Sequence, residues 1–319
     1  MRFALRCAAV LALALVAAAA QAQPYPSKPI RFLIASSPGG GTDGIGRVIA
    51  EALSTSFKQP VVTENRGGAS GVIASEQLVK SAPDGYTIMI TQNGHVTNPA
   101  IFKKLPYDTF KDFTPIAPLA RSPLVFIATT GTGVKTVKEW LELAKRDPRA
   151  MTFAAAESST RLAIEQLAQT TGIGITSLPY KGTGPAVADV AGGHVNFAVT
   201  TIASVLPFRG GGKVNIVAVM APERTTFLPD VPTVSEQGLA RIDLRGWWGI
   251  FGPANMPSAL VEQLNGAIRA ALATPAVRHK IENFSAEVWI GSPQELDTFV
   301  RAEVPAIQAL ARKAGIEPE

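Results

Sequence analysis

The sequence predicts an α/β protein with two lobes, each a mainly parallel sheet flanked by helices. Short apolar runs typical of strands alternate with segments of helical periodicity along nearly the whole chain, which indicates repeated β-α-β units. The 319 residues are at the upper limit for a single hydrophobic core. Two strand-like runs, LVFIATT (124–130) and GWWGIFGP (246–253), bracket a self-contained α/β block, and we interpret them as the crossovers between the lobes.

Residues 1–22 have the pattern of a secretory signal peptide. Arg2 and Arg6 precede an apolar run at 8–20, and Ala-Gln-Ala at 20–22 supplies small residues for a cleavage site. The run is too short to favour a spanning helix, so a retained N-terminal anchor is the less favoured alternative. Cys7 is the only cysteine, and it lies inside this run. We therefore expect a periplasmic protein whose mature chain has no thiol.

The charge of the mature chain excludes two classes of partner. Loss of Arg2 and Arg6 with the signal peptide lowers the formal charge from +5 to +3. So small a positive charge does not suggest nucleic acid or an anionic membrane surface. No later segment is apolar enough to cross a bilayer, so we expect a soluble extracytoplasmic protein.

The first lobe is predicted to consist of residues 23–124 and 250–319. Its longest N-terminal helix has apolar residues on one face at the 3.6-residue period. The expected strands are 30–36, 60–65 and 86–91, and the expected helices are 42–57, 71–80 and three more from Ser258 onward, separated at Thr274-Pro275 and Ser292-Pro293.

The second lobe is predicted to consist of residues 125–249. Its expected strands are 123–130, 151–156, 175–180, 195–201, 214–221 and 247–253, of which the first and last connect the lobes, and its expected helices are 137–145, 161–171 and 185–191.

A glycine-rich loop joins the first strand to the first helix. Residues Gly39 to Gly44 match G-x-G-x-x-G, and Glu64 ends the next strand, which is the layout of a dinucleotide-binding fingerprint. The same loop also suits a carboxylate, because glycines let backbone N–H groups approach an anion at the start of a helix. Export makes NAD scarce, and the loop lacks the lysine of a P-loop. We favour the carboxylate, with an oxidoreductase as an alternative.

Longer stretches resemble a known family along essentially the whole mature chain. They include YPSKPIRFLIASSPGGGTDGIGR, QPVVTENRGGASG, APDGYTIMI, LPYKGTGPAVADVAGGHVNFAV, LPDVPTVSEQG and WWGIFGPANMP. This order of motifs resembles the Bug family of periplasmic solute receptors, the TctC-like binding proteins of tripartite tricarboxylate transporters. The resemblance implies a type II periplasmic-binding (Venus flytrap) fold and capture of a di- or tricarboxylate or an aromatic acid. It also implies delivery to membrane permease subunits; we expect a monomer without cofactor.

The resemblance also implies which residues of the first lobe contact the ligand. Two loops supply backbone amides at helix starts, and a third supplies two side-chain amides. Thr42 has a hydroxyl that can donate to a carboxylate, whereas Asp43 is favoured as a helix-start acid over a binder of water. The expected residues are Gly40, Gly41, Thr42, Asp43, Ala69, Ser70, Gly71, Gln92 and Asn93.

The second lobe departs further from the family pattern. Arg161 stands where the family has a histidine, and it either clamps a carboxylate or pairs with Glu157 or Glu165 at the surface. The family often has an acidic residue near the end of the 195–201 strand, and its absence suggests a more acidic or an aromatic ligand rather than a zwitterionic amino acid. The expected ligand residues are Ser158, Ser159, Thr160, Arg161, Tyr180, Thr200 and Thr201.

The remaining chemistry-bearing residues do not suggest catalysis. His95, His194 and His279 lack metal-ligand spacing, and we expect them on the surface or in loops. No G-x-S-x-G elbow or Ser-His-Asp arrangement is evident. Trp247 and Trp248 are candidates for one ring at the cleft and one in the core. We predict a receptor rather than an enzyme, the rivals being an exported enzyme acting on an organic acid and a periplasmic adaptor.

Overall fold

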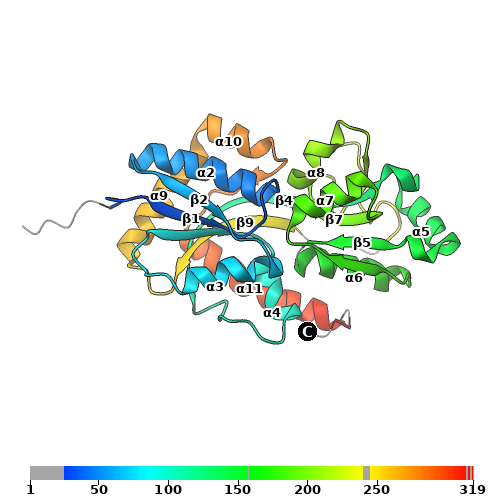
Figure 1. The fold of residues 1–319 in the computed structure, drawn as a ribbon, viewed down its shortest axis with the longest axis horizontal. Coiled ribbons are helices and arrows are strands. Elements are labelled where there is room, and N and C mark those ends of the chain that lie inside the picture. Colours follow the sequence, from blue (N-terminus) through cyan, green and yellow to red (C-terminus); the bar gives the residue numbers. More distant parts are fainter. Residues whose placement is uncertain (1–24, 157, 240–244, 314, 317, 319) are drawn as a thin grey trace, which may run out of the picture.

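The computed structural model describes residues 25–156, 158–239, 245–313, 315, 316 and 318, so the predicted signal peptide lies outside the described residues. Two α/β halves lie side by side along the long axis (Figure 1). The first half contains the N-terminal third and the C-terminal helices, and the second half contains the middle of the chain. Within the described part, no helix combines the length and apolar character needed to cross a membrane.

The first half has helices on both faces of its sheet (Figure 1). Helices α2, α9 and α10 cover one face, and α3, α4 and α11 cover the other. Its elements are β1 (Ile30–Ile34), α2 (Gly41–Phe57), β2 (Val61–Asn65), the 3₁₀ turn η1 (Ala69–Gly71), α3 (Val72–Val79), β3 (Thr87–Thr91), α4 (Gly94–Ile101), α9 (Ser258–Ala273), α10 (Pro275–Glu282), β10 (Glu287–Val288) and α11 (Pro293–Lys313).

The second half repeats this layered arrangement. Helices α5 and α6 pack on one face of its sheet, and α7 and α8 pack on the other. Its elements are η2 (Thr130–Thr132), α5 (Val137–Arg146), η3 (Pro148–Ala150), β5 (Thr152–Ala155), α6 (Ser158–Thr171), β6 (Thr176–Pro179), α7 (Thr183–Gly192), β7 (Phe197–Thr201), α8 (Ile202–Arg209) and β8 (Val214–Val219).

Two long strands, β4 (Phe113–Thr129) and β9 (Arg245–Pro253), join the halves. The strand order is β2-β1-β3-β9-β4-β7-β5-β6, and β8 and β10 also pair with β4. The outer strands of each half are parallel, as predicted, whereas β4 and β9 pair antiparallel with every neighbour. The predicted lobe boundaries, at 124/125 and 249/250, fall within these two strands and stay a prediction.

Three elements differ from the sequence prediction because of prolines. Strand β4 begins ten residues before the predicted run at 123–130, and it accommodates Pro115 and Pro118 at irregularities in its pairing with β9. Helices α4 and α8 were not predicted, and each contains an internal proline, Pro99 or Pro207. Proline disfavours helix interiors and central strands, so these segments gave no clear periodic signal.

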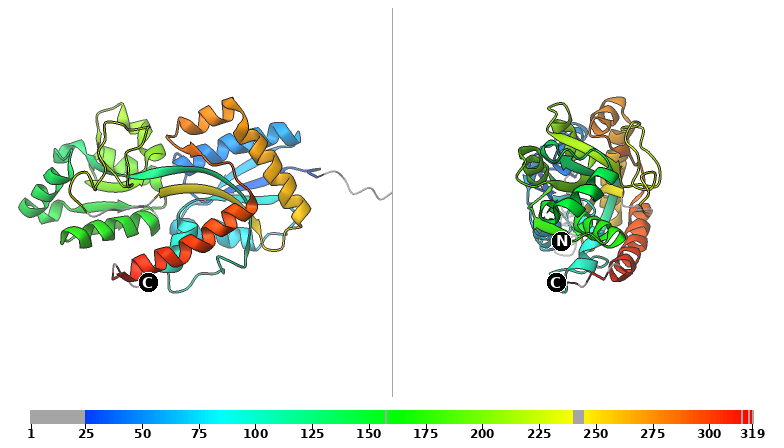
Figure 2. Two further views of the ribbon diagram at one scale, coloured as in Figure 1. Left: turned by 180° about the vertical axis from the view of Figure 1, so that it is seen from behind. Right: turned by 90° about the vertical axis from the view of Figure 1, so that its right-hand side faces the viewer.

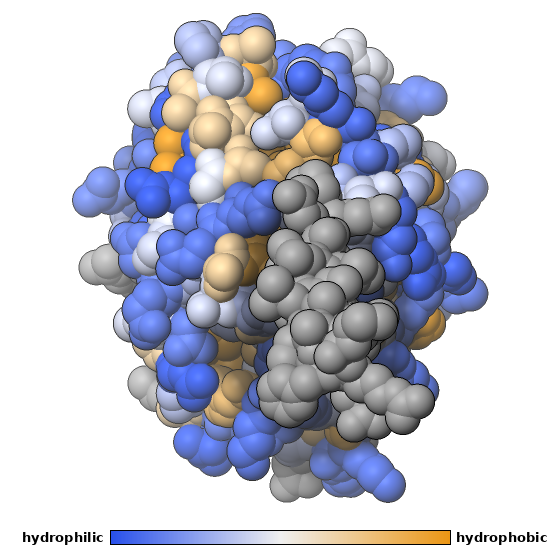
Figure 3. Space-filling model, turned by 90° about the vertical axis from the view of Figure 1, so that its left-hand side faces the viewer, coloured by the Kyte–Doolittle hydropathy of each residue, from blue (hydrophilic) through white to orange (hydrophobic). Residues whose placement is uncertain are grey.

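The outer end of the first half has an apolar groove between α2, α9 and α10. Its volume is about 400 Å³, and small apolar side chains form most of its lining. Figure 3 shows apolar residues gathered at the top of this face, the side on which α10 lies in Figure 1. The groove contains none of the predicted ligand residues.

Candidate functional site

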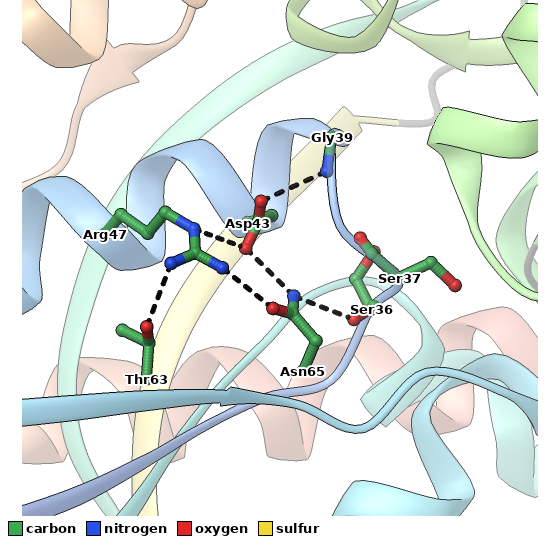
Figure 4. A network of polar contacts seen from close by, with 7 residues as sticks. All are labelled: Ser36, Ser37, Gly39, Asp43, Arg47, Thr63 and Asn65. Carbon is green, nitrogen blue, oxygen red and sulfur yellow. Dashed lines mark hydrogen bonds and ion pairs between the residues drawn. The ribbon is translucent and has the colours of Figure 1, made fainter.

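The glycine loop between β1 and α2 is held by a carboxylate (Figure 4). Asp43, in the first turn of α2, accepts hydrogen bonds from Gly39 N at 3.1 Å, Arg47 Nε at 2.9 Å and Asn65 Nδ2 at 2.9 Å. Gly39 has φ +86°, a left-handed conformation that favours glycine. Asp43 is thus a helix-start acid that supports the loop, as favoured from the sequence. Its carboxylate accepts the hydrogen bond of the Gly39 N–H, so this donor is already used.

Arg47 and Asn65 extend this support to the neighbouring strand. Arg47 donates to Thr63 Oγ1 at 3.1 Å and to Asn65 Oδ1 at 2.9 Å. Asn65 also donates to the Ser36 carbonyl at 3.2 Å. Because hydrogen bonds between charged groups are stronger than neutral ones, the network fixes the end of β1 and the start of α2 relative to β2.

The glycine loop touches the second half directly. A Cβ atom at Gly40 would lie 2.7 Å from Thr183 Oγ1, and one at Gly41 would lie 2.8 Å from Ala203 Cβ. Gly41 N donates to Ser204 Oγ at 3.4 Å. Both positions therefore require glycine for the halves to approach this closely.

A cluster of buried hydroxyls faces the loop from the second half. Ser204 Oγ lies 3.0 Å from both Thr201 Oγ1 and Thr183 Oγ1. All three residues are buried. Thr201 was predicted, whereas Thr183 and Ser204 were missed. Thr183 had a usable signal, because Gly182-Thr183-Gly184 repeats the strand–glycine–helix pattern of the first loop.

The turn at Ala69–Gly71 has an unusual backbone. Ala69, Ser70 and Gly71 have φ values of +46°, +54° and +88°. Consecutive left-handed residues that are not glycine cost of order 1–3 kcal/mol each and cluster at functional sites. Asn98 donates to the Ser70 carbonyl at 3.2 Å, and a Cβ at Gly94 would have no room beside that carbonyl. The turn is therefore held from α4.

Two predicted side chains of the first half bond to β9. Thr42 is buried and accepts from Trp248 Nε1 at 2.9 Å. Asn93 donates to the Arg245 carbonyl at 2.7 Å and accepts from Trp247 N at 2.9 Å. The Asn93 amide therefore anchors the start of β9, whereas the sequence suggested that it contacts a ligand. Gln92 beside it is buried.

The predicted residues of the second half fall into two groups. Ser159 and Thr160 are buried in the first turn of α6, which begins at Ser158, and Arg161 is half-buried. Thr200 is also buried, and its hydroxyl has no partner among the described residues. These positions do not contradict the expected contacts with a ligand.

Tyr180 differs from its expected place at the floor of the site. Its hydroxyl donates to Asp189 Oδ2 at 2.6 Å, within the second half. Burial, followed by the hydrogen bond and charge of Asp189, raises the pKa of Tyr180 to about 12. The hydroxyl is thus bound to α7. The sequence does not reveal this pairing, because the direction of a side chain at a strand end depends on how the neighbouring helix packs.

His95 corrects another expectation. It was predicted on the surface or in a loop, but it is 1 % exposed in α4 and lies between Phe113 and Phe251, with ring centroids 4.7 and 4.4 Å away. Neither ring nitrogen has a partner among the described residues. Burial lowers the pKa of His95 to about 3, so the imidazole is neutral.

Glu64 is the residue that a dinucleotide fingerprint would place on a ribose. It forms ion pairs with Arg31 at 2.8 Å and Arg66 at 3.1 Å. The hydrogen bond from Arg31 is the main reason that the pKa of Glu64 is about 2. Glu64 therefore has a structural role between β1 and β2. Among the described residues, no group of His, Cys, Asp and Glu forms a metal site.

The arrangement as a whole is suited to an anion. The N-terminal ends of α2, α7 and α8 meet at the contact between Gly40, Gly41, Thr183 and Ser204. Helix N-termini carry a partial positive charge and free N–H groups, and each stabilises an anion by roughly 0.3–1 kcal/mol. Surrounding hydroxyls can donate as well.

Comparison with known proteins identifies the family. Residues 45–316 match the TctC family, described as the tripartite tricarboxylate transporter family receptor. The chain belongs to this receptor family. BugT of Bordetella pertussis is 31 % identical over 309 residues, which cover 96 % of this chain and 95 % of BugT.

Solved structures of receptors in the Bug group share the fold. The periplasmic binding protein BugD has a TM-score of 0.89 at 30 % identity, covering 92 % of this chain and 100 % of BugD. A Rhodopseudomonas palustris protein solved with adipate also has a TM-score of 0.89, at 31 % identity and the same coverage. MatC from Rhodopseudomonas palustris, with bound malate, has a TM-score of 0.85 at 29 % identity, covering 90 % of this chain and 99 % of MatC. The two-lobed periplasmic-binding fold predicted from the sequence is confirmed.

Proposed function

We propose that this receptor works in the periplasm, where it binds a small organic acid by a carboxylate between its two halves and delivers it to the permease of a tripartite tricarboxylate transporter. The direct contact of Gly40 and Gly41 with Thr183 and Ser204 carries the proposal, because it brings helix N-termini of both halves and hydroxyls of the second half together. The adipate and malate bound to the two Rhodopseudomonas palustris relatives support a carboxylate.

The remaining ligand contacts belong to the same proposal. We expect backbone amides of the 69–71 turn and of the α6 start (158–161) to contribute, together with the Thr200 hydroxyl. Asp43 lies near the glycine loop but is already bonded to Arg47, and no acidic side chain ends β7. An acidic or aromatic ligand is therefore favoured over a zwitterionic amino acid, whose ammonium group would need an acceptor.

Closure of the halves is the proposed mechanism. The ligand shifts the equilibrium only by the difference in its affinity for the closed and open states. Contacts from both halves provide this difference, and bending of β4 and β9 near 124/125 and 249/250 permits the movement. The closed receptor, as a monomer, then docks on the permease and performs no chemistry on its ligand.

A thermal-shift screen with mono-, di- and tricarboxylates and aromatic acids tests the proposal. A ligand at 100 times its Kd adds about 2.7 kcal/mol to the free energy of unfolding. Recovery of a chemically altered ligand would contradict the proposed function. Stabilisation by aspartate and glutamate alone would contradict the proposed preference for an acidic or aromatic ligand.

Gly41→Ala tests whether closure is needed. The new methyl group meets Ala203 Cβ at 2.8 Å, and this overpacking costs about 1–3 kcal/mol in the closed state only, or roughly 10- to 100-fold in affinity by calorimetry. Gly266→Ala, in α9 with open space around it, is the control. Unchanged affinity in Gly41→Ala would show that the ligand binds without the contact between the halves.

A further inference from the structure

The loops that follow the two edge strands of the sheet meet each other. Strands β2 and β6 are at opposite ends of the strand order, whereas β4 and β9, which join the halves, are in its middle. Figure 2, from behind, shows these two strands running from one half to the other. Gly67, two residues after β2, nevertheless contacts Lys181, two residues after β6. The opening between the halves, which we call the mouth, is thus closed on the side that the strand order places farthest from β4 and β9.

A hydrogen bond crosses the mouth. Ser37 Oγ, in the loop after β1, donates to the Lys181 carbonyl at 2.8 Å. A Cβ atom at Gly67 would lie 2.7 Å from Ser37 N and 3.0 Å from the Lys181 carbonyl oxygen, so three segments touch here through their main chains. A Cβ at Gly184 would lie 3.0 Å from the Pro38 carbonyl oxygen. We call these five residues the clasp: Ser37, Pro38, Gly67, Lys181 and Gly184.

The clasp is distinct from the hydroxyl cluster at Ser204. The bond between Ser37 and Lys181 is exposed to solvent, and Pro38 is exposed as well. Ser204, in contrast, is 1 % exposed. The clasp contains none of the residues expected to contact the ligand. It therefore joins the halves at the surface through contacts of the protein with itself.

Another contact between the halves, at α6, is apolar. Leu162 of α6 is 0 % exposed and belongs to the core of the first half, together with Ala100 of α4 and Ile307 of α11. Leu310 of α11 packs against the cores of both halves. Burial of a whole leucine side chain contributes more to stability than one exposed hydrogen bond. Separation of the halves therefore costs less at the clasp than at Leu162.

We propose that the clasp controls release of the ligand, because it holds the mouth closed and is the first contact to break when the halves open. This inference rests on the proposed function, in which the ligand binds between the halves. Opening bends β4 and β9, so the displacement is largest at the loops farthest from them, and a small rotation already breaks the Ser37 bond. Since the bond is not made to the ligand, it slows release of every ligand that the site accepts.

Distances between spin labels test the clasp without a ligand. Cys7 is the only cysteine and lies in the predicted signal peptide, so labels attach to the mature chain only at introduced cysteines. Val62→Cys on β2 and Thr176→Cys on β6 place labels on the two sides of the mouth, at exposed positions. Double electron–electron resonance should show mainly one short distance in the wild-type background. Val62→Cys with Ile73→Cys, both in the first half, is the control pair.

Two variants weaken the clasp in different ways. Ser37→Ala removes the hydrogen bond and should raise the ratio of open to closed mouth by about two- to tenfold. Gly184→Ala should raise it more, because its methyl group meets the Pro38 carbonyl only when the halves are together. Ser81→Ala, whose hydroxyl donates to a carbonyl within the first half, and Gly192→Ala, in the same helix as Gly184, are matched controls and should leave the ratio unchanged.

The rate of release is the second measurement. Ser37→Ala should speed dissociation of the carboxylate found in the screen by the same factor in stopped-flow experiments, with a smaller change in the association rate. Lys181→Ala keeps the main-chain carbonyl that accepts the bond, so its dissociation rate should equal that of the wild type.

The outcomes separate this proposal from the proposed function. The clasp is overturned if the wild type shows only a long distance across the mouth, or if neither Ser37→Ala nor Gly184→Ala changes that distance. It is also overturned if Ser37→Ala releases the ligand no faster than the wild type, or no faster than Lys181→Ala. Failure of the carboxylate screen, with a longer mouth distance in both variants, would reject the proposed function and leave the clasp as the contact that holds the halves together.

Discussion

The two halves hold their sides of the site with different interactions. In the first half, the Asp43 carboxylate and the Arg47 guanidinium fix the glycine loop through charge-assisted hydrogen bonds. In the second half, the facing group is a cluster of neutral hydroxyls centred on Ser204. Charge-assisted bonds are about twice as strong as neutral ones and more demanding in geometry.

This difference assigns a separate task to each half. The Asp43 network fixes the glycine loop, so in the proposed binding mode the backbone donors of Gly40 and Gly41 set where a carboxylate lies. A hydroxyl can rotate to donate or accept, so Thr183 and Ser204 can adapt to the ligand and to closure. The first half is thus preorganised, and the second half adjusts.

The largest expected effect concerns acid stability and lies in the first half. His95 has a pKa of about 3 in the folded protein and about 6.5 when unfolded, so unfolding takes up a proton between these values. Its contribution is complete above pH 6.5 and is lost as the pH falls toward 3, about 4–5 kcal/mol in all. His95→Leu should reduce the pH dependence of the free energy of unfolding, measured by urea titration, by about one proton.

Val96→Ala, at the next position of α4, is the matched control. Val96 is 1 % exposed and carries no titratable group, so this variant should lower the free energy of unfolding without changing its slope between about pH 4 and 6. If both variants follow the wild-type slope, His95 is solvated or hydrogen-bonded in solution and the first half is not the acid-sensitive one.

The sequence predicted the elements with regular periodicity and the loops that follow them. Strand β1, helix α2 and the glycine loop between them were placed correctly, because apolar periodicity and glycine act locally. The two strand-like runs that bracket the middle of the chain, together with the family resemblance, predicted the two-lobed arrangement. Strand β4 was predicted too short, because Pro115 and Pro118 interrupt its pattern and only pairing with β9 reveals it.

The sequence could not predict which residues contact each other when they are far apart in the chain. Gly41 and Ser204 are 163 residues apart, and no local pattern marks their contact. Trp247 and Trp248 are adjacent in sequence, yet Trp248 bonds to Thr42 while the Trp247 indole N–H has no acceptor among the described residues. Their roles depend on which face of β9 each occupies, which requires the register of the sheet.

A second prediction tests how strongly the first half is preorganised. Asp43→Ala removes the acceptor of three hydrogen bonds and leaves Arg47 without its carboxylate, so the free energy of unfolding should fall by about 1–3 kcal/mol. Asp297→Ala breaks an ion pair of the same i,i+4 spacing with Arg301, but at the surface, and should cost at most about 0.5 kcal/mol. Equal losses in the two variants, measured by chemical denaturation, would show that the loop network adds nothing beyond an ordinary helix pair.

The smallest expected effect is in the hydroxyl cluster. Ser204→Ala removes the partner shared by Gly41 N, Thr183 and Thr201, all neutral bonds, and should cost about 1 kcal/mol. The bond to Gly41 N joins the halves, so its share of the cost should fall on the closed state, whereas the other two bonds lie within the second half. The affinity for the carboxylate found in the screen should drop by up to about fivefold, mostly through faster dissociation in stopped-flow measurements.

Ser235→Ala is the control for this last variant. Ser235 also lies in the second half with a buried hydroxyl, but that hydroxyl has no partner among the described residues, so its removal should be neutral or slightly stabilising. A matching loss of affinity in both variants would point to a general effect on the second half. Unchanged dissociation in Ser204→Ala would mean that closure depends on the first half and the ligand alone, and the adaptable role of the hydroxyls would then be wrong.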